Sequence, residues 1–188
     1  RDIGKWKSKE LAKRLAILTQ SNNIQMKLTV RELVTFGRFP YSGSHLNEED
    51  QRIIDKAIAY MELEPFQDRF IDELSGGQLQ RVCIARAVAC KPEVILFDEA
   101  ISSLDAHTQV QVMDLLRDLK EKLGLTYVFI THDLTSITYL CDDVLFLYQG
   151  RVTEYLPVSR ISETKDEYAR RLLESIVVFD TETSEVDV

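Results

Sequence analysis

The sequence predicts an α/β fold built on a parallel sheet. Three short apolar runs, at residues 15–19, 94–97 and 127–130, have the length of buried strands. Stretches with helical character separate the runs, and parallel strands need such crossover connections. Because continuous apolar runs are typical of strands covered on both faces, we expect helices on both sides of this sheet.

The first elements are a short helix and a strand. Residues 8–15 favour a helix, with Ser8 as its N-cap and Glu10 as an acid in the first turn. The apolar run at 15–19 then ends in Gln20, and the polar residues 21–23 break the pattern.

Residues 21–72 predict a helical insertion, because no segment in this range has the pattern of a strand. Thr29 is expected to cap a helix that runs to Phe36, and residues 37–43 are expected to form turns. A longer helix should start around Asn47 and bury one apolar face. That face would consist of Ile53, Ile54, Ala57, Ile58 and Met61.

The second half alternates helices and strands. A helix is expected over 82–89, and an amphipathic helix over 108–123 that stops at Gly124. Gln149 and Gly150 separate two strand-forming segments and predict a hairpin. A last helix is expected over 165–177, and the acidic tail from Thr181 is expected to be disordered.

Composition narrows the functional classes. The 188 residues suffice for one domain with a core. The net charge of −8 disfavours a nucleic-acid partner, because surfaces that bind nucleic acid usually carry basic stripes. No apolar run approaches the ~20 residues that cross a bilayer. No secretory signal opens the chain, so we expect a cytoplasmic location. The three cysteines lack metal-ligand spacing and are expected to be small buried residues.

The first candidate motif is the turn Ser75-Gly76-Gly77-Gln78, which precedes a predicted helix. Paired glycines let backbone N–H groups approach a phosphate, and a helix N-terminus adds positive potential. The alternative for such a turn by itself is a purely structural loop.

The second motif is a pair of carboxylates, Asp98 and Glu99, at the end of the apolar run at 94–97. Asp98 is placed to help hold Mg²⁺, which prefers oxygen ligands. Glu99 is placed to polarise an attacking water as a general base. The alternative for the dipeptide alone is a helix-capping acidic pair.

Three weaker candidates complete the set. Ser102-Ser103-Leu104-Asp105 is, taken alone, an ordinary helix N-cap. His132 follows the run at 127–130, where a lone histidine is usually structural. Gln20 closes the first run and carries almost no signal by itself.

In this order and spacing, the motifs resemble those of the ATP-hydrolysing subunits of ABC transporters, over nearly the whole chain to about residue 177. The resemblance implies a P-loop NTPase-type parallel sheet with an inserted helical subdomain, and ATP and Mg²⁺ as ligands. It implies that Glu99 is the general base, that His132 contacts the γ-phosphate, and that Asp98 and Gln20 attend the Mg²⁺. It also implies that one group of residues binds nucleotide across a dimer interface: Ser75, Gly76, Gly77, Gln78 and Asp105.

One element of that family pattern is missing from the sequence. The P-loop pattern G-x-x-x-x-G-K-[ST] does not occur, and only Gly4-Lys5 has the right dipeptide. In the family this segment and its strand lie upstream of the position that Arg1 occupies. We therefore expect the P-loop strand to be absent from the sheet, and the chain to bind no ATP on its own.

The resemblance divides between two subfamilies. Residues 28–43 look like the ATPases of iron–siderophore importers, in the region that contacts the permease in this family. Residues 98–105, 129–134 and 168–173 look more like oligopeptide and nickel importer ATPases. We expect iron–siderophore import, with oligopeptide or nickel import as the alternative. The mixture fits either an unusual natural relative or a chimera with a junction near Ser75.

The implied partners are transmembrane permease subunits and a second ATPase subunit, in a homo- or heterodimer at the cytoplasmic face of the membrane. A catalytically incompetent partner module remains an alternative function. A DNA-repair ATPase is disfavoured because residues 21–72 are too short for its coiled coils. Four segments are expected: a core strand segment at 1–20, the helical and permease-docking region at 21–74, the motif-bearing core at 75–160, and a C-terminal helix and tail at 161–188.

Overall fold

The computed structural model describes residues 3–20, 26–43 and 45–182, with side chains to residue 174. The chain divides into two compact units, residues 1–132 and 133–188, and each is described by itself. The four-segment division expected from the sequence stays a prediction.

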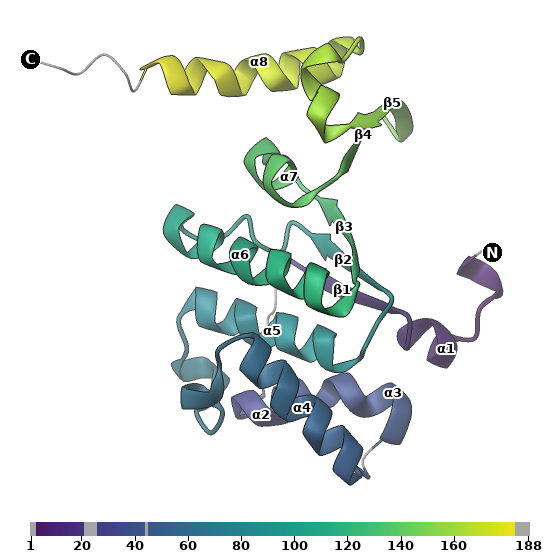
Figure 1. Ribbon diagram of the computed structural model, residues 1–188, viewed down its shortest axis with the longest axis vertical. Coiled ribbons are helices and arrows are strands. Elements are labelled where there is room, and N and C mark those ends of the chain that lie inside the picture. Colours follow the sequence, from purple (N-terminus) through teal and green to yellow (C-terminus); the bar gives the residue numbers. More distant parts are fainter. Residues whose placement is uncertain (1–2, 21–25, 44, 183–188) are drawn as a thin grey trace, which may run out of the picture. The chain divides into compact units, whose positions relative to one another are not determined.

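The first unit contains a three-stranded parallel sheet with the order β1-β2-β3 (Figure 1). The strands are β1 (Leu15–Thr19), β2 (Val94–Asp98) and β3 (Thr126–Ile130), which confirms the three predicted runs. The register pairs Thr19 with Asp98 and Asp98 with Ile130. The carboxyl ends of all three strands are therefore level with one another.

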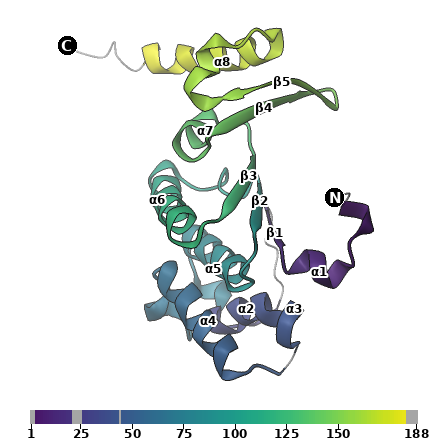
Figure 2. The same ribbon diagram turned by 45° about the vertical axis from the view of Figure 1, so that its right-hand side comes forward.

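Helices cover only one face of this sheet within the described chain, so the expectation of helices on both faces was wrong. Figure 2 shows α5 (Gly76–Ala89) and α6 (Ala106–Leu123) on the same side of the strands. On the opposite face, Ile17 and Val128 flank Leu96 and are about half exposed. The reason is topological. Both crossovers step in the same direction across the sheet, and crossovers of one hand then place their helices on one side.

The covered face carries an aromatic cluster. The rings of Phe97 and Phe129 stack with their centroids 4.4 Å apart, and Tyr127 meets Phe97 edge-on. The Tyr127 hydroxyl donates a hydrogen bond of 3.0 Å to the carbonyl of Leu116 in α6. Burial raises the pKa of Tyr127 because the phenolate would lose its hydration.

Before β1, a 3₁₀ helix (Ile3–Lys5) is followed by α1 (Ser8–Ala12). The N-cap of α1 is Lys7, whose backbone is extended and whose side chain makes no capping hydrogen bond. The prediction that Ser8 caps this helix was therefore wrong. Ser8 already has a helical backbone, so its side chain stands one position too late to cap.

The insertion between β1 and β2 is helical, as predicted. It contains α2 (Val30–Thr35), α4 (Glu48–Tyr60) and two 3₁₀ turns (Glu64–Phe66 and Ile71–Glu73). Thr29 and Asn47 each form a capping box, and the apolar face of α4 is buried.

Residues 37–43 are mostly helical, so the prediction of turns there was wrong. A 3₁₀ helix (Phe36–Arg38) leads directly into α3 (Phe39–Ser42). Pro40 favours this start because its fixed φ suits the first turn of a helix. Only Gly43, with a φ of 58°, leaves the helical region of the backbone.

Helix α5 begins at Gly76, six residues before the expected start at Val82, because Ser75 and Gln78 form a capping box that starts the helix at the motif itself. Helix α6 ends at Gly124 as predicted, and the left-handed φ of 63° there suits glycine.

The second unit contains α7 (Leu134–Leu140), the antiparallel strands β4 (Asp143–Tyr148) and β5 (Arg151–Pro157), a 3₁₀ segment (Val158–Glu163) and α8 (Glu167–Glu182). The predicted hairpin is confirmed, with positive φ at Gln149 and Gly150. Helix α8 includes Thr181, so the expected disorder does not begin there, and residues 183–188 lie outside the described chain. No helix among the described residues could span a membrane.

Candidate nucleotide-binding site

The carboxyl edge of the sheet gathers four of the predicted site residues. Gln20 follows β1, Asp98 is the last residue of β2, Glu99 comes directly after it, and His132 lies two residues beyond β3. In the sheet register Asp98 pairs with Thr19 on one side and with Ile130 on the other, and both partners are exposed on the uncovered face of the sheet. Sheet register is therefore what brings together residues that are far apart in the sequence.

Glu99 has an uncommon backbone conformation. Its φ is 49°, in the left-handed region, where a non-glycine residue costs about 1–3 kcal/mol. Three hydrogen bonds hold it there. Its N–H donates to the carbonyl of Ile130 at 2.9 Å, and its own carbonyl accepts from the hydroxyl and N–H of Ser102 at 2.8 and 3.3 Å. Sequence reasoning included Ser102 in the motif at 102–105, but its hydrogen bonds to the Glu99 carbonyl have no sequence pattern.

The Glu99 side chain reaches the imidazole of His132. Glu99 Oε1 lies 3.4 Å from His132 Nδ1, while 37% of the Glu99 side chain and 71% of the His132 side chain are exposed. A carboxylate and an imidazole at this distance can exchange a proton directly, and solvent has access to both. The pair is the chemically most capable feature of this edge.

The turn at residues 75–78 forms the first turn of α5. The Ser75 hydroxyl accepts from the N–H of Gln78 at 3.3 Å, and the Gln78 side-chain oxygen accepts from the N–H of Ser75 at 2.9 Å. Each side chain thus accepts a hydrogen bond from the backbone N–H of the other residue. The remaining N–H groups at the start of α5 are available to an anion.

The two glycines of this turn have different surroundings. A Cβ added at Gly76 would meet no atom within 4 Å, whereas a Cβ at Gly77 would overlap the Cγ2 of Thr108 in α6. Gly77 is therefore required for packing between α5 and α6. Gly76 faces open space, where a ligand could approach the backbone.

Asp105 is the N-cap of α6, which is the structural alternative weighed from the sequence. Its Oδ1 accepts from the N–H of Thr108 at 3.0 Å. Hydrogen bonds from the hydroxyl and N–H of Thr108 hold the pKa of Asp105 below its ordinary value. A role of Asp105 in binding nucleotide stays a prediction. Thr108 contacts both Asp105 and the Gly77 position, and no sequence pattern indicates the second contact.

Within one chain these residues form two separate groups. Among the described residues, no hydrogen bond or ion pair joins Glu99 or His132 to the turn at 75–78. No cluster of three or more histidine, cysteine or acidic side chains in the described part could hold a metal ion alone. Gln20 is placed at the correct edge and is exposed, but its role there stays a prediction.

Residues 1–102 match the model of the family described as ABC transporter. The chain belongs to the ABC transporter family. Three curated relatives illustrate the membership. A petrobactin import ATP-binding protein of Bacillus subtilis is 44% identical over 163 residues, or 87% of this chain and 65% of the relative. A metal-staphylopine import ATP-binding protein of Staphylococcus aureus is 46% identical over 114 residues, which are 61% of this chain and 46% of the relative. A Brucella ovis protein assigned provisionally to peptide import is 40% identical over 149 residues, which are 79% of this chain and 45% of the relative.

The fold of ABC ATPases is confirmed by solved structures. A subunit of the cbiONQ ABC transporter complex from Clostridium perfringens matches with a TM-score of 0.74 and 28% identity, covering 83% of this chain and 62% of that one. The chain spans between 45% and 65% of the length of the three curated relatives.

Proposed function

We propose that this chain is the ATP-binding and ATP-hydrolysing subunit of an ABC importer. The observation that carries the proposal is the meeting of Glu99 and His132 at the carboxyl edge of a parallel sheet, where α/β proteins usually bind ligands. Family membership supports the same assignment.

In this proposal Glu99 accepts a proton from the attacking water, and His132 orients that water and the γ-phosphate. General-base action of this kind contributes about 10²–10⁴-fold to a rate. The exposure of both side chains supports access by water. The hydrogen bond that the Glu99 N–H donates to Ile130, and those that its carbonyl accepts from Ser102, keep the Glu99 backbone fixed during the reaction.

Asp98 and Gln20 would hold Mg²⁺ together with phosphate oxygens of the nucleotide. Their donor chemistry fits, because protein-bound Mg²⁺ is usually held by one or two carboxylates, water and substrate phosphates. The ion would neutralise charge that develops on the phosphates. A site shared in this way needs no cluster of protein ligands, in agreement with the described residues.

The chain would act as a nucleotide-sandwich dimer. The open space at Gly76 and the unpaired N–H groups at the start of α5 suit the γ-phosphate of a nucleotide held by the opposite subunit. The separation of the 75–78 turn from Glu99 and His132 supports a composite site, since each subunit would offer one group to each nucleotide.

A catalytically incompetent partner module is the second candidate. The observation that favours it is the missing P-loop pattern, whose backbone nest and lysine supply most phosphate binding. In both proposals, a chain of this sequence binds ATP only through contacts that another segment or subunit supplies. The intact pair of Glu99 and His132 favours a subunit that hydrolyses.

The permease would dock on residues 21–46, around Phe36, Phe39 and Tyr41. Phe39 is 63% exposed, and the other two rings are also exposed, which supports docking over simple packing of the helical region. Residues 21–25 and 44 of the proposed surface lie outside the described chain. The subunit would thereby be peripheral, at the cytoplasmic face of the membrane.

We favour import of iron–siderophore complexes. The segment at 28–43 touches the permease in this proposal, so its likeness to siderophore importers bears most on the substrate. The petrobactin relative supports this choice. Oligopeptide or nickel import is the alternative, and the peptide-import relative supports its oligopeptide half.

The proposal is tested by uptake in cells that lack their native importer ATPase. A P-loop-complete version of this subunit is expressed beside either a siderophore permease or a peptide permease. We expect rescue of ferric-siderophore uptake. Rescue of peptide uptake alone would reverse the choice of substrate, and no rescue with either permease would contradict the importer function.

A further inference from the structure

The helical region contains one ion pair that is almost fully buried. Only 6% of the Arg38 side chain and 1% of the Asp50 side chain are exposed, and Arg38 Nε donates to Asp50 Oδ1 at 2.8 Å. Asp50 also accepts from the Ser42 hydroxyl and from the N–H of Asn47. Stability alone explains such a pair poorly, because burying two charges costs about as much as their attraction returns.

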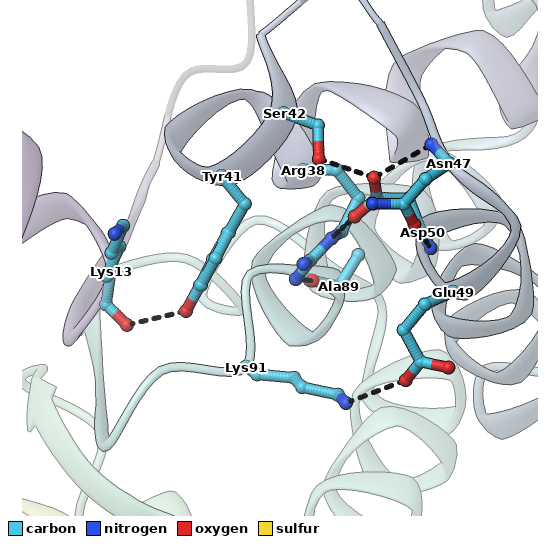
Figure 3. A network of polar contacts seen from close by, with 9 residues as sticks. All are labelled: Lys13, Arg38, Tyr41, Ser42, Asn47, Glu49, Asp50, Ala89 and Lys91. Atoms are coloured by element: carbon cyan, nitrogen blue, oxygen red, sulfur yellow. Dashed lines mark hydrogen bonds and ion pairs between the residues drawn. The ribbon is translucent and has the colours of Figure 1, made fainter.

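The same guanidinium reaches the end of the helix that starts at the nucleotide-binding turn. Arg38 Nη1 donates to the carbonyl of Ala89, the last residue of α5, at 2.9 Å (Figure 3). A cation is favourable there because the C-terminus of a helix is electronegative. The neighbouring Gly37 lies so close to the carbonyl of Arg86 that a Cβ would overlap it. Residues 37 and 38 thus pack directly against the last turn of α5.

A second connection runs from the same segment to the start of the sheet. The Tyr41 ring lies 4.0 Å from the Arg38 guanidinium, and its hydroxyl is 3.5 Å from the carbonyl of Lys13. The next residue, Arg14, accepts two hydrogen bonds through its carbonyl, from the N–H groups of Glu93 and Val94 at 2.9 and 3.0 Å. Tyr41 therefore touches the chain just before β1, where β1 and β2 begin side by side, and Gln20 and Glu99 directly follow the far ends of these strands.

We propose that Arg38 is a positioning residue that links the docking surface to both halves of the nucleotide site. The inference rests on the docking proposed above. The exposed rings of Phe36 and Phe39 are on either side of Arg38 in the sequence, so a partner that moves them also moves the guanidinium. Helix α5 has 14 residues and carries that movement over about 20 Å to Gly76.

Arg38→Lys is the sharpest test. Lysine keeps the positive charge that Asp50 requires, but its single ammonium cannot replace a planar fork that bonds Asp50, bonds Ala89 and stacks on Tyr41 at once. Arg52→Lys is the matched control. Arg52 lies in α4 of the same helical region, outside the proposed docking surface, and pairs with Glu48 at 3.9 Å.

The assay uses the P-loop-complete subunit, both free and assembled with its permease in proteoliposomes. Three quantities are measured: the KM and kcat for ATP of the free subunit, its retention by the permease, and the stimulation of ATP hydrolysis by the assembled, substrate-loaded transporter. We expect Arg38→Lys to keep the first two and to lower the stimulation by roughly 2- to 30-fold, the range of mutations that weaken coupling. Arg52→Lys should keep all three.

Two outcomes would overturn the inference. One is unchanged stimulation in Arg38→Lys, and the other is an equal loss of activity in the free and the assembled subunit, which indicates a structural role only. If Arg38→Lys does not fold, Tyr41→Phe tests the second connection in the same assay, and its full stimulation would also count against the inference. Failure of the proposed function looks different, because the unaltered subunit would then neither bind the permease nor hydrolyse ATP.

Discussion

Replacing Gly77 with alanine should destabilise the chain, whereas the same change at Gly76 should not. A Cβ at Gly77 overlaps Thr108 Cγ2, and Thr108 cannot turn away without losing the hydrogen bond from its hydroxyl to Asp105. Overpacking costs about 1–3 kcal/mol, and the greater helix propensity of alanine offsets about 1 kcal/mol of that cost. The net loss in the free energy of unfolding should therefore be about 1 kcal/mol.

Gly76 provides the comparison, because a Cβ there meets no atom within 4 Å. Alanine at such a position is neutral or stabilises by about 0.4–1 kcal/mol, since it restricts the unfolded chain. The two variants should thus differ by about 1–2 kcal/mol. In a P-loop-complete dimer, Gly76→Ala should nevertheless lower ATPase activity, because the added methyl group occupies the space offered to the γ-phosphate.

The assay is urea unfolding of the chain followed by circular dichroism, with the midpoint and the slope fitted for each variant. Thr108→Ser removes Cγ2 but keeps the hydroxyl, so it should restore stability to Gly77→Ala in a double-mutant cycle. The reasoning is refuted if Gly77→Ala is as stable as the parent, or if Thr108→Ser gives no rescue.

Four further predictions concern the site and the docking surface. In a P-loop-complete subunit, Glu99→Gln should lower kcat by ~10²–10⁴-fold and leave ATP binding nearly intact, because only the general base is lost; turnover at the parental rate would show that Glu99 is not the base. The chain of this sequence should bind no Mg-ATP by isothermal titration, since the P-loop is missing, and micromolar binding would contradict that. Replacing Phe39 and Tyr41 with serine should uncouple transport from ATP hydrolysis, whereas unchanged uptake by folded protein would exclude docking there. The pKa of Asp105 is lower in the folded chain than in the unfolded chain, so ionised Asp105 stabilises the fold at a pH above its unfolded-state pKa. This stabilisation is lost as the pH falls below about 4, so the stability of Asp105→Ala should decrease less over that range. Thermal melts from about pH 2 to 6 measure the difference.

Helix starts with a side-chain cap were predictable because their causes are local. Thr29 and Asn47 cap the first turn of α2 and α4 through partners three residues away. The two failures have different causes. Ser8 has the right side chain one position too late, which is a local cause. The stretch at 37–43 stays helical because Pro40 suits a first helical turn and because Gly37 packs against α5, which is a tertiary contact.

The candidate site was predictable in its members but not in its geometry. The residues at 98, 99 and 132 stand out because they follow apolar runs. The contact between Glu99 and His132 spans 33 positions, and the positive φ of Glu99 has no sequence pattern. The contacts that Ser102 and Thr108 make were not predicted, because serine and threonine near a helix start are ordinary.

The sequence by itself determined which segments become strands and helices, and in which order the motifs of an ABC ATPase occur, because periodicity, caps and spacing are properties of neighbouring residues. Only the tertiary structure decided that helices cover one face of the sheet and that Arg38 reaches Ala89 across 51 positions. The physical reason is that sheet register and crossover handedness, rather than local preference, determine which distant residues meet.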